Sequence, residues 1–160
     1  MKNIFLLLPL AFFLSACVAD PCQKTVNDEP GLDLAFGLKS GQSVKEASLL
    51  AFGKNKNEDK TCGDAPIVEI KEHINHGKFS GDVKLTFFGT HGLVGVWIWP
   101  DDPHADPNKI FALPSAIAFG ENKEIEGYEI SWGKVNDSTV FTITDERRTN
   151  KMREWVTRKH

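Results

Sequence analysis

Carboxylates and an imidazole gather in residues 101–107, which include Asp101, Asp102, His104 and Asp106. These are side chains that bind metal ions, so the segment is a candidate metal site. Its spacing does not match the D-x-D-x-D-G series and distal glutamate of an EF-hand calcium loop. Because three prolines flank or interrupt the segment, the sequence favours a rigid exposed loop over a metal site.

The histidines offer a second candidate chemistry, since His73 and His76 stand three residues apart. On a helix they would share one face, but the glutamate of the zinc-protease motif H-E-x-x-H is missing. Asn75 and Gly77 are turn residues, so we expect a solvated loop there, and we expect His91 in a hairpin turn. No arrangement in the sequence matches a catalytic triad, a carboxylate pair or a phosphate loop. We therefore predict no catalytic residue and no cofactor.

Two tryptophans, Trp97 and Trp99, alternate with apolar residues in one segment. Aromatic side chains are enriched at interface hot spots and stack on sugars or peptides. Tryptophan is also ordinary core material in a sheet. The sequence favours core packing for both residues and keeps a binding role as the alternative.

The C-terminal end is basic although the rest of the chain is acidic. Such an end can contact anionic lipid or lipopolysaccharide phosphates. A charged edge strand, protected against aggregation, is the interpretation that we favour. The candidate binding residues in this segment are Arg147, Arg148, Lys151 and Arg153, followed by Arg158 and Lys159.

The first residues have the features of an export signal. Lys2 supplies a positive start, and an apolar run from Ile4 to Leu14 follows, interrupted only by Pro9. This run is shorter than the about 20 residues that a membrane-spanning helix needs. A charged start, a short apolar core and small residues before a break indicate a secretory signal peptide over residues 1–16.

The end of that signal, Leu14-Ser15-Ala16-Cys17, resembles the lipobox of bacterial lipoproteins. The resemblance implies a diacylglyceryl thioether on Cys17, cleavage after Ala16 and an acyl chain such as palmitate on the new amino group. Several acyl chains hold a protein stably on a membrane. Val18 follows the cysteine where an inner-membrane lipoprotein has aspartate, which implies the outer membrane. The alternative is an ordinary signal peptide that leaves Cys17 as a thiol.

If Cys17 is lipidated, Cys22 and Cys62 remain as a pair. Exported domains fold in an oxidising compartment, so we expect a disulfide between them, with two free thiols as the alternative. Closing this loop would stabilise the domain by roughly 4 kcal/mol in the chain-entropy model. Without a C-x-x-C spacing, a metal site at these cysteines is not expected.

The first expected element of the folded domain is a helix over 44–52. Ser43 and Glu46 form the S-x-x-E capping box, and Gly53 suits the C-cap. Strand patterns then dominate, and a turn is expected over 133–138. The end of the chain, 152–158, fits a helix or a strand, and we favour a strand returning in a hairpin. The other expected strands cover 67–70, 83–87, 94–98, 125–132 and 139–144.

The sequence thus predicts an α+β fold with one short N-terminal helix followed by a mainly antiparallel sheet of about six strands. With 160 residues, we expect a signal over 1–16, a lipidated tether over 17–30 and a single domain over 31–160. The apolar content of 41% argues against wholesale disorder. A net charge of -3 argues against a strongly basic nucleic-acid binder.

These features predict a non-catalytic lipoprotein that is anchored to the outer membrane and binds an envelope protein or another envelope component. One alternative is an envelope inhibitor or immunity protein acting on a cell-wall hydrolase or toxin. The S-G-x-x-Y pattern of membrane-bound lysozyme inhibitors is not matched, because Lys84 follows Ser80-Gly81 without the tyrosine. Another alternative is a metal-assisted hydrolase that uses His73, His76, His91 or His104.

Overall fold

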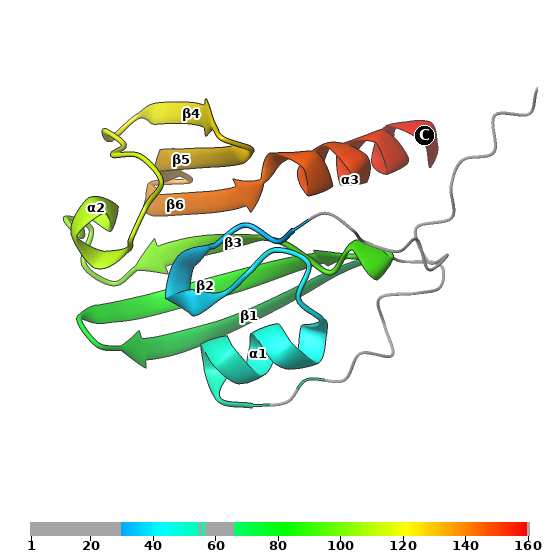
Figure 1. Ribbon diagram of the computed structural model, residues 1–160. Helices are drawn as coiled ribbons and strands as arrows, with labels where there is room; N and C mark the ends of the chain where they lie inside the picture. Colours follow the sequence, from blue (N-terminus) through cyan, green and yellow to red (C-terminus); the bar gives the residue numbers. More distant parts are fainter. Residues whose placement is uncertain (1–29, 55, 57–65, 160) are drawn as a thin grey trace, which may run out of the picture.

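The computed structural model describes residues 30–54, 56 and 66–159 (Figure 1). The signal segment, the lipobox and nearly all of the tether lie outside the described residues. So do Cys17, Cys22 and Cys62. Lipidation and the disulfide therefore stay predictions from the sequence. Among the described residues, no helix is long and apolar enough to span a bilayer.

In the described part of the chain, six strands form one antiparallel sheet in the order β1-β2-β3-β6-β5-β4. The sheet consists of two three-stranded meanders joined where β3 pairs with β6. This arrangement confirms the expected α+β class. The strands are β1 (Ile67–His76), β2 (Phe79–Phe88), β3 (Leu93–Pro100), β4 (Glu121–Ile125), β5 (Tyr128–Val135) and β6 (Ser138–Asp145).

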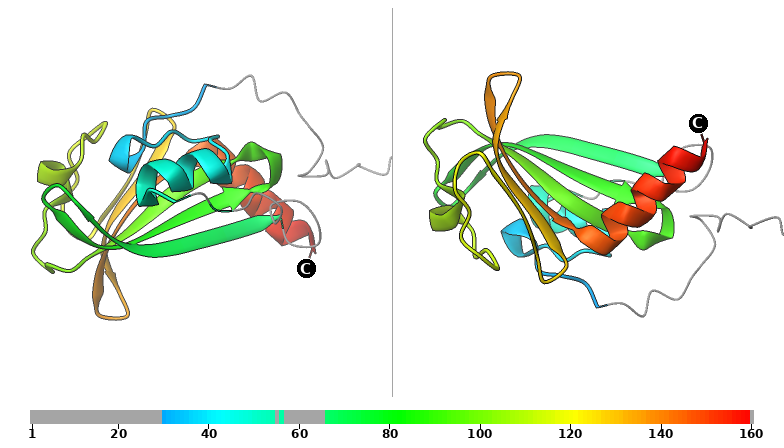
Figure 2. Two further views of the ribbon diagram at one scale, coloured as in Figure 1. Left: turned by 90° about the horizontal axis from the view of Figure 1, so that it is seen from below. Right: turned by 90° about the horizontal axis from the view of Figure 1, so that it is seen from above.

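The helical elements lie before, between and after the strands. A 3-10 turn, η1 (Ala35–Gly37), and the helix α1 (Val44–Phe52) precede the sheet, and the turn η2 (Gly89–His91) joins β2 to β3. The short helix α2 (Pro107–Ile110) lies in the crossover from β3 to β4. The last helix, α3 (Glu146–Lys159), continues directly from β6. Figure 2 shows α1 over one face of the sheet, whereas α3 runs obliquely past the ends of the strands, with its C-terminal end toward the other face.

The sequence predicted α1 with its observed bounds, and the structure contains both of the caps on which that prediction rested. Ser43 Oγ accepts from the Glu46 backbone N at 3.3 Å, and Glu46 Oε2 accepts from the Ser43 backbone N at 3.0 Å. Gly53 ends the helix in the left-handed conformation, which glycine adopts without a Cβ clash. These signals are local, so they are visible without the tertiary structure.

The core lies on the face of the sheet that α1 and η1 cover. Strand side chains alternate between faces, so every second residue of the central strands points into this core. Leu38, Val44 and Ala47 pack onto it from the N-terminal segment. The strands contribute Val83, Leu85, Phe87, Val96, Ile98, Ile130, Phe141 and Ile143.

Three expectations for the strands were wrong in detail. His73 and His76 lie in β1, which continues to a turn at Gly77, and not in a loop. The strand expected over 125–132 is split between β4 and β5 by a turn at Glu126 and Gly127, both with positive φ. The turn expected over 133–138 shortens to two residues with positive φ, Asn136 and Asp137. Positive φ at both central positions matches the right-handed twist of the flanking strands, which lets them extend.

The C-terminal segment is a helix, so the expected hairpin was wrong. Asp145 ends β6 and caps α3, because its Oδ1 accepts from the backbone N of Arg147 at 3.1 Å and of Arg148 at 3.3 Å. The apolar face of α3 packs back on the sheet, where the Trp155 and Phe88 rings lie 6.0 Å apart. The basic run therefore belongs to a helix, and the interpretation as a charged edge strand was wrong as well. The sheet edges are β1 and β4.

A buried ion pair lies where α3 begins. Arg148 Nε is 3.2 Å from Asp145 Oδ2, and the two side chains are 2% and 0% exposed. Asp145 Oδ2 also accepts from Ser40 Oγ at 2.7 Å, and Arg148 Nη1 donates to the His91 carbonyl at 2.7 Å. At Gly41, where φ is +84°, a Cβ would stand 2.8 Å from Arg148 Nη2, so glycine is needed beside the guanidinium. The pair therefore joins the N-terminal segment, η2, β6 and α3.

We expect Asp145→Ala to lower the free energy of unfolding by about 3–5 kcal/mol, because it leaves the Arg148 charge buried without this partner. Urea unfolding followed by circular dichroism measures this loss. The matched control is Glu129→Ala, which removes an acidic partner from the exposed Arg153 and should cost about 1 kcal/mol or less. Equal losses in the two variants would contradict a special role for the buried pair.

Candidate functional site

The second face of the sheet is the candidate binding surface. Trp97 and Trp99 alternate with Val96 and Ile98, which belong to the core, so the two indoles point away from that core. Both tryptophans are half-buried, and neither belongs to the core cluster. The expectation of core packing is therefore wrong, and the binding alternative stays open. We call this side of β1, β2, β3 and β6 the open face.

Two lysines hold the indoles in place. Lys84 Nζ lies 4.8 Å from the Trp97 ring centroid and 6.0 Å from that of Trp99. Lys71 Nζ lies 4.8 Å from the Trp99 ring centroid. These distances are those of cation–π contacts, and each lysine stem also covers apolar surface while its ammonium stays near water. The two tryptophans and two lysines thus form one ladder across β1, β2 and β3.

Carboxylates on neighbouring strands fix the lysines. Lys71 Nζ is 2.7 Å from Asp82 Oδ2, and Lys84 Nζ is 2.7 Å from Glu69 Oε1. Lys71 on β1 lies opposite Lys84 on β2, and Asp82 on β2 lies opposite Trp99 on β3. Opposite charges on adjacent strands therefore surround the aromatic pair on the open face.

His73 lies between two carboxylates at the end of this ladder. Its Nδ1 is 3.1 Å from Asp82 Oδ1, and its Nε2 is 3.6 Å from Asp101 Oδ2. The Ser80 hydroxyl donates to Asp101 rather than to the histidine. The Ser80 hydroxyl is therefore not activated by His73, and the cluster is not a nucleophile–base pair.

The Lys71 ammonium and the His73 imidazole bind the Asp82 carboxylate. The hydrogen bond from Lys71 is the larger cause and that from His73 the next, and together they lower the pKa of Asp82 below its ordinary 3.8. Partial burial acts in the opposite direction and does not cancel them. Asp82 is therefore ionised at neutral pH, and the ladder keeps its opposite charges.

The four basic candidates of the C-terminal segment do not form one exposed patch. Arg148 is internal, and Arg147 is half-buried with its Nη2 3.3 Å from the Pro30 carbonyl. Arg153 Nη2 lies 2.9 Å from both carboxylate oxygens of Glu129. Lys151 is exposed on α3. Arg148 is thus a structural residue, and the exposed basic candidates of this set are Lys151 and Arg153.

Of the histidines considered for a metal site, His73 and His76 share β1 but fall on opposite faces of the sheet, and the other two lie on other elements. His76 ends β1, His91 stacks on Phe88 in η2 with ring centroids 5.4 Å apart, and His104 lies in the exposed loop after β3. Within residues 30–54, 56 and 66–159, no three His, Cys, Asp or Glu side chains form a group suited to a metal ion.

Sequence reasoning found the two tryptophans but missed the residues that hold them. Lys71, Lys84 and Asp82 carry no motif, and their meeting depends on how β1, β2 and β3 align. A signal was present in the alternation of charged and apolar residues along β1, where Glu69, Lys71 and His73 share one face.

Comparison with known proteins adds no family or fold relative. The chain matches no family model, no curated protein and no solved structure.

We expect NMR titration of the Asp82 carboxyl to give a pKa below 3.8, and Lys71→Met to move it upward. Lys45→Met, which removes an exposed lysine from α1, should leave the Asp82 pKa unchanged. Because folding lowers this pKa, the ionised carboxylate stabilises the fold above the unfolded pKa. That contribution is lost as the pH falls through the lower folded value. An unchanged Asp82 pKa in Lys71→Met would show that the ammonium does not bind the carboxylate in solution.

Proposed function

We propose that this protein is a lipoprotein of the bacterial outer membrane whose domain binds another envelope protein without catalysing a reaction. The observation that carries the binding part is the placement of Trp97 and Trp99. They lie on the open face of the sheet, half-buried and outside the core cluster. The anchoring part rests on the lipobox that ends at Cys17.

The layout of the open face suits a protein partner. Protein interfaces combine an aromatic centre with a polar rim, and tryptophan is among the residues most enriched at hot spots. Here the two indoles lie on the central strand β3, and charged side chains of β1 and β2 surround them. The rim contains both signs of charge, which favours a partner with a mixed surface over a purely anionic one.

A lipid anchor at Cys17 is consistent with a domain that binds another envelope protein. Acylation at Cys17 would place the domain on a membrane surface, joined through the tether over 17–30. A binding module at that position captures partners of the envelope. An inhibitor or immunity protein would use the same kind of face, so the identity of the partner separates the two functions.

The anchoring proposal predicts that Cys17→Ser shifts the protein out of the membrane fraction. With the wild-type chain, we expect metabolic labelling by a clickable palmitate and partition into the detergent phase of Triton X-114. With Cys17→Ser, both are lost, because no thiol accepts the diacylglyceryl group. Cys22→Ser is the matched control and should keep the label. A Cys17→Ser protein that still carries the label would overturn the lipobox assignment.

The binding proposal predicts a photocrosslink from the open face. A benzophenone amino acid at Thr142, opposite Trp97 on β6, should capture one envelope protein in intact cells. The same probe at Lys45 on α1 should not.

We expect Trp99→Ala and, separately, Lys71→Glu to reduce the crosslink from Thr142 at least about tenfold, as for a hot-spot residue. Circular dichroism and the unfolding midpoint confirm that each variant folds. Equal yields from Thr142 and Lys45, or no effect of either variant, would contradict a specific protein site. Capture of peptidoglycan strands instead of a protein would identify a glycan-binding face.

A further inference from the structure

A cleft on the core side of the molecule lies outside the open face. It has a volume of about 750 Å³, which falls in the range of small-molecule sites. Three chain segments enclose it: the turn η1, the turn between β1 and β2, and the helix α2 with the residues that follow it. Residues far apart in the sequence therefore line one concave surface, which we call the aromatic cleft.

Phenylalanines form the floor of the aromatic cleft. The Phe36 ring lies 5.3 Å from Phe79 and 5.1 Å from Phe111 between centroids, and Phe79 lies 6.0 Å from Phe111. His76 completes the group with its ring edge-on to Phe36 at 5.8 Å. Phe36 and Phe111 are half-buried, so part of this apolar floor remains accessible.

Phe36 is held in an unusual backbone conformation. Its φ and ψ are 61° and 27°, in the left-handed region that bulky residues rarely adopt. Such strain persists where the surrounding structure imposes it, and it is common at ligand sites. Here the strain falls on an aromatic residue of the cleft floor, whereas the next residue, Gly37, adopts its positive φ of 71° at little cost because it has no Cβ.

The charge at the rim is positive. Lys78 and Lys109 line the cleft and are exposed. Asp33 is the acidic residue of the lining, and its Oδ1 is already 3.3 Å from Lys39 Nζ. Lys109 is 82% exposed and 3.5 Å from Asp106, a geometry that contributes little binding energy and leaves the ammonium accessible. An apolar floor below two lysines is complementary to a molecule with an apolar body and an anionic head.

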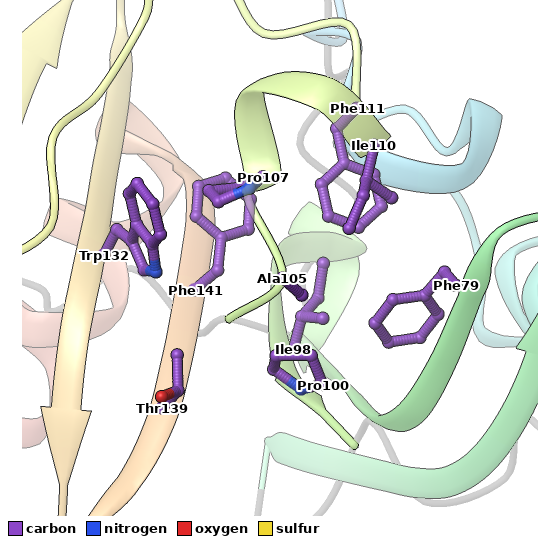
Figure 3. A pocket seen from close by; sticks show the side chains of 10 residues that line it. All are labelled: Phe79, Ile98, Pro100, Ala105, Pro107, Ile110, Phe111, Trp132, Thr139 and Phe141. Carbon is purple, nitrogen blue, oxygen red and sulfur yellow. The ribbon is translucent and has the colours of Figure 1, made fainter. Parts of the chain in front are cut away.

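A second, smaller pocket continues inward from the floor. Phe79, Ile110 and Phe111 line both spaces, so they form the wall between them (Figure 3). The inner pocket is apolar and holds about 10 Å³, near the lower limit for one water molecule. Trp132 lines its far side, and its buried Nε1 has no hydrogen-bond partner among the described residues. Because Trp132 and Phe111 line the same inner pocket, the fluorescence of the Trp132 indole should change when a ligand contacts Phe111.

We propose that the aromatic cleft binds a free amphiphilic anion, with an acyl or aromatic body on Phe36, Phe79 and Phe111 and its carboxylate, sulfate or phosphate head at Lys78 and Lys109. This site is separate from the open face, so it does not depend on the proposed protein partner. Aromatic contact supplies most of the affinity, and the lysines select the sign of the head group.

The test uses the Cys17→Ser chain, so that no attached lipid competes. Anilinonaphthalene sulfonate, a fluorescent amphiphilic anion, should bind saturably, and dodecanoate should displace it. Dodecyltrimethylammonium has the same tail with a cationic head, and we expect at least about tenfold weaker displacement by it. Tryptophan fluorescence should change on adding dodecanoate, and Trp132→Phe should remove most of that change.

Charge-reversed variants locate the head group. Lys78→Glu with Lys109→Glu should weaken dodecanoate binding at least about tenfold, because two attractive charges become repulsive. Lys45→Glu with Lys134→Glu changes the net charge equally at exposed sites outside the cleft and should leave binding unchanged. Phe36→Ala should weaken the binding of both dodecanoate and the dye.

Several results would overturn the proposal. One is equal displacement of the dye by dodecyltrimethylammonium and by dodecanoate. Another is equal dodecanoate binding by the two double variants. A third is a change in tryptophan fluorescence with phosphatidylglycerol vesicles but none with dodecanoate. The last result would assign the lysines to a membrane surface. Unfolding midpoints of all variants separate lost binding from lost folding.

Discussion

Asp145 and Arg148 form an ion pair that is buried where β6 meets α3. Neither charge reaches solvent, so each must keep its partner when the domain is folded. The same carboxylate ends β6, caps α3 and accepts from Ser40, while the guanidinium donates to the His91 carbonyl. One ion pair therefore fixes where the sheet stops, where the helix starts and where the N-terminal segment docks.

The alternation of side chains gives the sheet two different surfaces. On one, aliphatic and phenylalanine residues pack under α1 and η1. On the other, Trp97 and Trp99 stand among lysines and carboxylates whose positions follow from the strand register. α3 packs at one end of this second surface, through Trp155 and Phe88, and among the described residues both tryptophans stay half-buried. The described fold thus leaves part of each tryptophan accessible while keeping a full core on the other face.

The sequence was informative where structure is determined locally. The capping box at Ser43 and the alternation in β2 and β3 each lie within a few residues, so α1 and the central strands were predictable. α3 was not, because its cap, Asp145, is the last residue of a strand and its partners include Ser40, far away in the sequence. The lysine contacts on the open face and the convergence of Phe36, Phe79 and Phe111 likewise arise only when distant segments align.

The place where the N-terminal segment joins the domain has a mechanical consequence. Pro30 is held by Arg147, and the chain then returns through Leu32, whose backbone N–H donates to Ser40 Oγ, to Gly41, which pairs with Leu93. If Cys17 is acylated as proposed, tension between the bilayer and a captured partner enters the domain along this path, and also through Cys62 if the predicted Cys22–Cys62 disulfide forms. Along the path through Pro30, the first bonds under load are the Arg147–Pro30 and Leu32–Ser40 hydrogen bonds, and Ser40 passes the load to Asp145. That load would reach the buried Asp145–Arg148 pair, which lies on other residues than the tryptophans of the open face.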